Sequence, residues 1–91
     1  MTPNVKPQNQ KFREVQWIDV IGIAEWKTMT DLLRHKLPVF STRGWILHHD
    51  NVRLIVAATR EMDPEHPDDC TYGDVTIIPV CLVKKVKRID A

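Results

Sequence analysis

The feature that most constrains the fold is the segment 41–59, which contains the longest apolar runs in the chain. Its two halves have the residue types of β-strands. The Asp-Asn pair at residues 50–51 suits a two-residue hairpin turn, because both residue types tolerate positive φ. We predict that one face of this hairpin packs in the core, since a one-residue slip would turn it towards solvent. That face carries two apolar cross-strand pairs: Leu47 with Leu54, and Trp45 with Val56.

The opposite face of the hairpin is mixed. In the same register Ile46 pairs with Ile55, and Gly44 lies opposite an alanine. His48 pairs with Arg53, so we expect a small cationic spot beside the two isoleucines. A 91-residue chain with one short helix has little to cover this face, and we expect a ligand or a partner to bind there.

Two further residues join the candidate site. Arg43 precedes the hairpin and suits contact with phosphates or carboxylates. Trp26 is the tryptophan that we expect at a surface or interface, whereas Trp17 and Trp45 belong to predicted core positions. The candidate binding residues are therefore Arg43, Ile46, His48, Arg53, Ile55 and Trp26.

Residues 25–37 are the helical candidate. Thr28 followed by Asp31 resembles a capping box, and Pro38 stops the helix. Apolar residues then recur at helical spacing. Because the helix is too short to be stable alone, we expect it to lie on the barrel or sheet.

The other elements are strands. Residues 12–21 predict a first strand, residues 74–83 a strand with a corner at Pro79, and residues 84–89 a short closing strand. About five bent strands with one helix between the first strand and the central hairpin indicate a mainly β (α+β) SH3-like or Sm-like barrel. A ferredoxin-like sandwich would need a second helix, which the proline-containing loop 61–74 does not offer.

Size and charge limit the choice of function. Ninety-one residues make one domain, which we divide into a flexible arm over residues 1–11 and a barrel over residues 12–91. The net charge of +1 gives no overall attraction to nucleic acid or to an anionic membrane. The charges are nevertheless segregated, because residues 61–74 hold six acids and no Lys or Arg, whereas residues 84–88 hold four Lys and Arg. Such segregation suits head-to-tail contact between subunits.

The cysteines and the hydropathy indicate a compartment. Cys70 and Cys81 are too few for a disulfide framework and suit a reducing environment. No segment approaches the ~20 apolar residues of a membrane span, and no apolar signal region follows Met1. We therefore expect a cytoplasmic protein with no membrane partner.

Several short stretches resemble a pattern in small uncharacterised bacteriophage proteins. They are VQWID at residues 15–19, Trp26, STRGWIL at residues 41–47, LIVA at residues 54–57, Ile78-Pro79 and VKKV at residues 83–86. The resemblance covers roughly residues 15–89. It implies an accessory protein acting in the cytoplasm of an infected bacterium, and it carries over no active-site residues.

A weaker resemblance is to the Sm-like RNA-binding proteins. These also have a helix and a bent five-stranded sheet, and they form rings by pairing strand edges. Their RNA-binding loop motifs are not matched by residues 48–52 or 76–79. The resemblance therefore implies no RNA binding for this chain.

Catalytic and metal signatures are missing from the sequence. A zinc site needs about four converging ligands, and the four histidines and two cysteines form no paired cluster such as C-x2-C. With three glycines there is no phosphate-cradling loop, and no nucleophile elbow is present. We predict a non-enzymatic protein without metal or cofactor. A hydrolase or nuclease toxin on a similar barrel, using His48 or His49, is the catalytic alternative.

These observations lead to one functional prediction and one alternative. We expect a small interaction protein, phage-encoded and self-associating into a homo-oligomer, that captures a small ligand or a host protein. The alternative is an Sm-like module that binds nucleotides, RNA or DNA through Arg43, Arg53 and the basic C-terminus, with nucleic acid as the less favoured partner.

Overall fold

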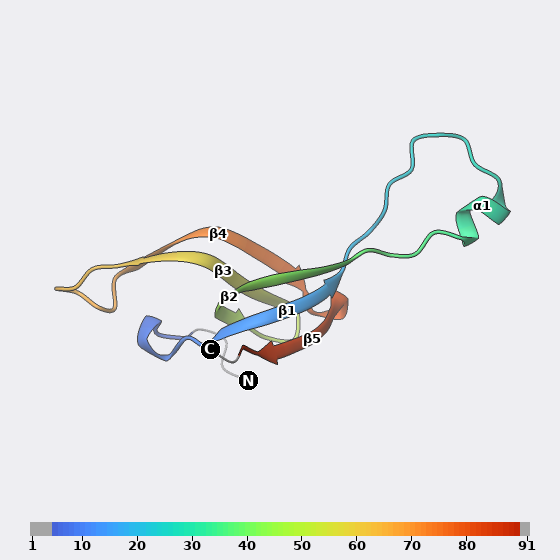
Figure 1. The fold of residues 1–91 in the computed structure, drawn as a ribbon. Coiled ribbons are helices and arrows are strands. Elements are labelled where there is room, and N and C mark those ends of the chain that lie inside the picture. Colours follow the sequence, from blue (N-terminus) through green and yellow to red (C-terminus); the bar gives the residue numbers. More distant parts are fainter. Residues whose placement is uncertain (1–4, 90–91) are drawn as a thin grey trace.

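The computed structural model describes residues 5–89 as one antiparallel sheet with two extensions (Figure 1). The strand order is β4-β3-β2-β1-β5, so the last strand returns to pair with the first. The prediction of a mainly β chain, with one short helix between the first strand and the central hairpin, is confirmed. Among the described residues the sheet is open, with β4 and β5 at its edges. In chain order the elements are η1 Pro7–Asn9, β1 Phe12–Ile18, α1 Met29–Leu33, β2 Val39–His49, β3 Arg53–Met62, β4 Cys70–Pro79, η2 Val80–Leu82 and β5 Val83–Arg88.

A small apolar core sits on one face of the sheet. Four large side chains from three strands form a cluster in which each is at most 1% exposed, and Ala57 on β3 is also fully buried. Burying each of the four large side chains stabilises the fold by about 1.5–3 kcal/mol relative to exposure, so the loss of any one matters in a chain this short. Those four are Val15, Leu54, Val56 and Ile78, and Trp17, Ile46, Leu82 and Val83 pack against them.

The register of the central hairpin differs from the predicted one. Three residues, 50–52, connect β2 to β3, and the Asp50 carboxylate accepts from the Val52 and Arg53 amides. His49 pairs with Leu54, where the predicted register had Val52. A further irregularity lies between Ile46 and His48. Ile46 therefore pairs with Val56, whereas Trp45 pairs with Ala57.

The faces of β2 are exchanged as a consequence. Leu54 and Val56 are in the core as predicted. Ile46 packs there in place of Trp45, and the prediction that Ile46 lies on a partner-binding face is wrong. The physical reason is the irregularity between Ile46 and His48. Next to the turn His49 pairs with Leu54, so the faces are still those predicted, but beyond the irregularity Ile46 pairs with Val56 and takes the core face.

The backbones of β2 and β3 approach closely at Gly44. Gly44 is buried, and a Cβ atom placed there would overlap the carbonyl group of Ala57 and would lie 2.9 Å from Val56 Cγ2. β2 pairs with β1 up to Trp45, and it pairs with β3 from Trp45 onward. Gly44 therefore occupies the point where β2 passes from one neighbour to the other.

The last strand enters the sheet through a corner. β4 ends at Pro79, as predicted, and the 3₁₀ turn η2 leads into β5. The amide of Val80 donates to the carbonyl of Val52 over 2.9 Å, which fixes the corner to the β2–β3 turn. Because Pro79 has no N–H, it fits at the end of the ladder, where no donor is needed.

Part of the predicted arm has defined contacts with the sheet. Residues 1–4 lie outside the described residues. From Val5 onward the chain follows β2, with Val5 donating to the Leu47 carbonyl over 3.3 Å and the Ile46 amide donating to Lys11 over 2.9 Å. Gln10 is buried in this segment.

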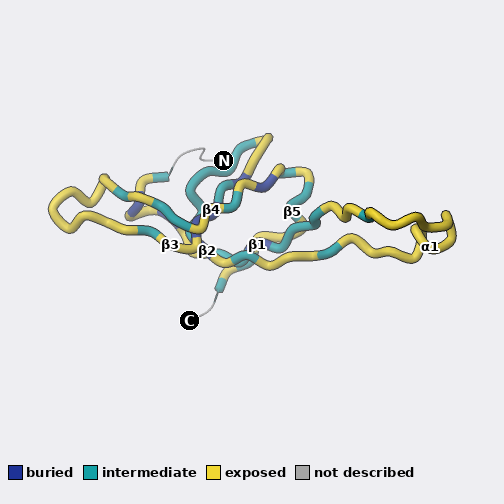
Figure 2. The backbone as a smooth tube through the Cα atoms, turned by 90° about the horizontal axis from the view of Figure 1, so that it is seen from above, coloured by how far each residue is buried: buried dark blue, intermediate teal, exposed yellow. Residues whose placement is uncertain are grey.

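The two extensions give the molecule its length. Its principal extents are 60 × 27 × 23 Å. At one end the β3–β4 hairpin continues beyond β2 to an acidic turn, and at the other end residues 19–38 leave the sheet as a long loop carrying α1 (Figures 1 and 2). All five residues of α1 are exposed, so the prediction that the helix lies on the sheet is wrong. No helix among residues 5–89 is long and apolar enough to cross a membrane.

Gly44→Ala is expected to lower the free energy of unfolding by about 1–3 kcal/mol, because the added methyl group must push β2 away from β3. Chemical denaturation followed by circular dichroism measures the change. Gly73→Ala is the matched control, since its Cβ would meet Thr59 at an ordinary 3.8 Å. Equal denaturation midpoints for the two variants would contradict the close approach of the strands.

Candidate interaction surface on the 19–38 projection

Residues 19–38, which we call the projection, begin and end at one pair of strand ends. Ile18 pairs with Val39 in the β1–β2 ladder. Just beyond this pair, the Asp19 amide donates to the Pro38 carbonyl over 3.1 Å. The Asp19 carboxylate in turn accepts from the Val20 amide over 2.8 Å. The base of the projection is therefore held closed by the sheet.

The outer part of the projection is organised by a capped helical turn. Thr28 has an extended backbone, and its hydroxyl accepts from the Asp31 amide over 3.2 Å. This is the N-cap that the sequence predicted, although α1 is shorter than the predicted helix. Arg34 forms a loose ion pair with Asp31, with 3.9 Å between Nη1 and Oδ1. The contacts described for residues 20–37 all have their partners within the projection.

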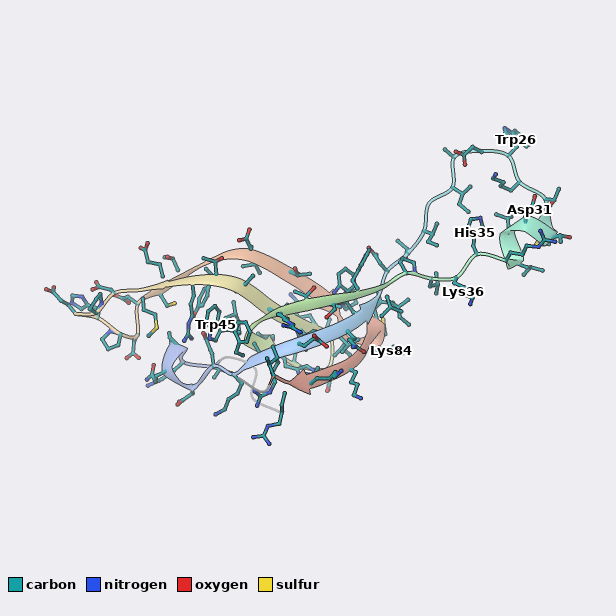
Figure 3. All side chains as sticks on the ribbon, in the orientation of Figure 1. Trp26, Asp31, His35, Lys36, Trp45 and Lys84 are labelled. Carbon is teal, nitrogen blue, oxygen red and sulfur yellow. The ribbon has the colours of Figure 1, made fainter. Side chains whose placement is uncertain are left out.

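The projection is apolar and uncovered. Trp26 is fully exposed, and Leu33 and Met29 are 77% and 69% exposed. Figure 3 shows Trp26 at the crest of the loop, directed away from the rest of the chain. Monomeric proteins rarely expose a continuous apolar patch of more than a few hundred Å² without a binding role. The seven large apolar side chains exposed here are Val20, Ile21, Trp26, Met29, Leu32, Leu33 and Leu37.

Charged side chains surround these apolar residues without a net excess. Lys27, Arg34 and Lys36 are matched in number by three acids in the projection. Lys36 and His35 lie on the returning limb of the loop, apart from Trp26 (Figure 3). The net charge of the projection is therefore zero, and its exposed surface is distinguished by its apolar side chains.

The structure does not bring the predicted site residues together. Trp26 stands on the projection, at one end of the long axis, whereas the others belong to the sheet (Figure 1). Ile46 is on the core face, and Ile55 pairs with His48 and Ile77. Arg53 pairs with Pro79. The predicted cross-strand pair of His48 with Arg53 is wrong, because the register of the ladder places Ile55 opposite His48.

Arg43 is engaged in a charge network across three strands. Its Nε lies 3.0 Å from Oε1 of Glu14, and Lys87 Nζ lies 3.7 Å from the other oxygen of the same carboxylate. The hydrogen bond from Arg43 holds the pKa of Glu14 below its usual value. Exposed ion pairs contribute little to stability. The network nevertheless gives Arg43 a partner within the chain.

His48 takes part in the turn beside it. Its Nε2 lies 2.6 Å from Oδ2 of Asp50. The other oxygen of Asp50 accepts from the amides of Val52 and Arg53 over 2.7 and 2.9 Å. The hydrogen bond from His48, followed by those two backbone bonds, holds the pKa of Asp50 far below its usual value.

A buried polar cluster under the arm was missed by the sequence reasoning. Gln10 Nε2 lies 2.7 Å from the hydroxyl of Tyr72, and Arg60 Nη1 donates to Gln10 Oε1 over 3.0 Å. Arg60 also donates to the Pro7 carbonyl and lies 4.4 Å above the ring of Trp45. Burial raises the pKa of Tyr72. The hydrogen bonds that join the arm to Arg60 and Tyr72 span 50 or more residues, so nothing in the sequence pairs these groups.

The acidic turn contains a hollow of about 460 Å³. Among residues 5–89 no three His, Cys, Asp or Glu side chains are arranged to hold a metal ion. Carboxylates without such convergence are typical of a solvated turn. The lining consists of Glu61, Asp63, Asp68, Asp69, Cys70 and Thr71.

Comparison of the chain with protein-family models, curated proteins and solved structures finds no match. The geometry of the chain itself must therefore carry the functional argument. Its most unusual feature is the projection, which presents an apolar surface from a closed base and packs against no other described element.

Asp50→Asn is expected to destabilise the protein at neutral pH, and the destabilisation should shrink as the pH falls below about 4. The pKa of Asp50 is lower in the folded chain than in the unfolded chain. Its charge therefore stabilises the fold above the unfolded-state pKa, and this contribution is lost as the pH falls towards the folded-state value. Urea denaturation of the wild type and the variant at pH 7 and pH 3 measures the difference in free energy of unfolding. Asp68→Asn, in the exposed acidic turn, is the control, and an equal effect of both substitutions would contradict the role of Asp50.

Proposed function

We propose that the protein is a non-enzymatic interaction module whose projection docks onto a protein surface. The observation that carries this proposal is the full exposure of Trp26 among six other exposed apolar side chains. A tryptophan buries about 150–250 Å² when it enters an interface, and tryptophan is enriched among the residues that dominate binding energy. The closed base presents these residues together, which reduces the ordering cost of binding.

A protein surface suits the projection better than a small ligand does. Small-molecule sites are concave and enclose most of the ligand. The projection stands out from the sheet, Trp26 points away from the rest of the chain, and all five residues of α1 are exposed (Figure 3). A complementary groove on a partner would cover several of them at once.

We also propose that the sheet is a small SH3-like or Sm-like barrel, of the kind found in the bacteriophage accessory proteins that the sequence resembles. The return of β5 to β1, the 3₁₀ turn before β5 and the change of partner along β2 at Gly44 support this assignment. Such a protein would act in the cytoplasm of an infected bacterium.

The interaction module can be tested by placing a photo-crosslinking amino acid at position 26 of the full-length protein in bacterial cells. A discrete covalent adduct is expected on illumination, because position 26 lies in the interface. Denaturing electrophoresis followed by mass spectrometry identifies the adduct. The matched control has the same amino acid at position 52, which is exposed in the β2–β3 turn. Equal adducts at both positions, or none at position 26, would contradict the proposal.

A second function, binding of RNA or DNA, is favoured by one observation. The β1–β5 ladder places Arg13 beside Arg88, next to Lys84, Lys85 and Lys87 on the same strand. This basic edge gathers local positive charge in a chain of nearly zero net charge. It would bind phosphates without reading bases.

Nucleic-acid binding through this edge must weaken steeply with salt, because phosphate contacts release counterions. Fluorescence anisotropy with single-stranded RNA and DNA between 50 and 200 mM salt, roughly the range over which that loss is large, is the measurement. Lys85→Glu should weaken binding, whereas Lys36→Glu on the projection should not. Salt-independent binding, or no binding at low salt, removes this second function.

A further inference from the structure

We infer that the surface covered by the projection belongs to a second copy of this chain, and that two copies exchange projections reciprocally. This inference rests on the proposed function, because it names the partner of the projection. It requires a second uncovered apolar surface on the same chain, complementary charge, and a geometry that lets both contacts form together.

The outer face of the sheet supplies the apolar surface. One row of paired residues crosses four strands, from Phe12 to Trp45, then Ala57, then Val75. In the next row Ile55 pairs with Ile77. These side chains alternate along β3 and β4 with Leu54, Val56 and Ile78, and all of them keep some exposure except Ala57, which is fully buried. We call this set the apolar row.

Much of the apolar row is open to solvent. Ile77 is 60% exposed, Val75 44% and Phe12 39%. The ring of Phe12 meets that of Trp45 edge-on, with 4.9 Å between centroids, and Arg60 lies over the Trp45 ring, so Trp45 is half-buried and Phe12 is the more accessible of the two. A flat apolar face of this kind can receive aromatic and aliphatic side chains such as those of Trp26 and Leu33.

Charge favours an antiparallel arrangement of the two copies. The β3–β4 end of the molecule carries six acids over residues 61–74 without a Lys or Arg, and Asp74 adjoins the apolar row. The projection has no net charge, but it offers three cations, Lys27, Arg34 and Lys36, of which Arg34 is paired with Asp31. Its charges can therefore orient the contact with the acidic end, while apolar burial supplies the attraction. The two regions lie at opposite ends of the 60 Å long axis (Figure 1). A two-fold axis across that length places each projection beside the acidic end of the other copy.

The size of the contact is adequate for a specific dimer. A standard interface buries about 800 Å² on each partner. Two tryptophans contribute about 300–500 Å² in total, and each projection adds six further apolar side chains. Because the arrangement is two-fold, every contact is made twice, and the pair closes without leaving a projection free.

The test is sedimentation velocity of the purified full-length protein over a range of micromolar concentrations. The wild type is expected to form a dimer, and Trp26→Asp and Ile77→Asp are each expected to weaken it at least tenfold. Val52→Asp changes a 63% exposed valine in the β2–β3 turn and should leave the dimer intact. Circular dichroism verifies that each variant retains its strands.

Mixing the two disruptive variants distinguishes exchange from other modes of association. A Trp26→Asp chain keeps an intact apolar row, and an Ile77→Asp chain keeps an intact projection. One of the two contacts is therefore whole in the mixed pair, and the mixture should dimerise more tightly than either variant alone. A mixture no tighter than its components would overturn reciprocal exchange.

The outcomes also separate this inference from the proposed function. If the wild type stays monomeric at high micromolar concentration while position 26 crosslinks to a different protein in cells, the interaction module stands and the self-exchange is wrong. If position 26 yields no specific adduct and the wild type is monomeric, both are wrong. A dimer unaffected by Trp26→Asp likewise overturns the exchange.

Discussion

The close approach of β2 to β3 at Gly44 is the constraint on which the rest of the structure depends. No side chain other than hydrogen fits between the two backbones there, because a Cβ would overlap the carbonyl of Ala57. The first half of β2 pairs with β1, and the second half pairs with β3. Val15 on β1 and Leu54 and Val56 on β3 thereby meet in one core.

A core this small cannot cover all the apolar residues of the chain. Four large side chains are fully enclosed, whereas the projection and the outer face of the sheet each keep a set of exposed apolar groups. Short chains bury a smaller share of their surface than long ones do. Association is the usual way for such a chain to gain further apolar burial. The same shortage of core that limits its stability therefore makes it suited to an interaction role.

The projection and the sheet have different physical organisation. Backbone ladders, the Gln10–Arg60 cluster and the Asp50 cap tie the sheet together across long sequence separations. The projection depends on the Asp19–Pro38 closure at its base and on local capping at Thr28. Its shape is therefore determined locally, and its position relative to the sheet is set at one point. An interface on such an element can adjust to a partner while the sheet remains unchanged.

Local chemistry determined much of this protein. Alternating apolar residues made the strands recognisable, Thr28 with Asp31 identified the N-cap, and Pro79 placed the corner before the last strand. The expectation that Trp26 lies at the surface is also confirmed. Only the tertiary structure decided the rest. An irregularity in the β2–β3 ladder between Ile46 and His48 reversed the faces of β2 beyond it, and the periodicity of the sequence does not reveal such a one-residue shift. Whether α1 packs on the sheet or stands away from it depends on contacts between distant segments, about which local propensity carries no information.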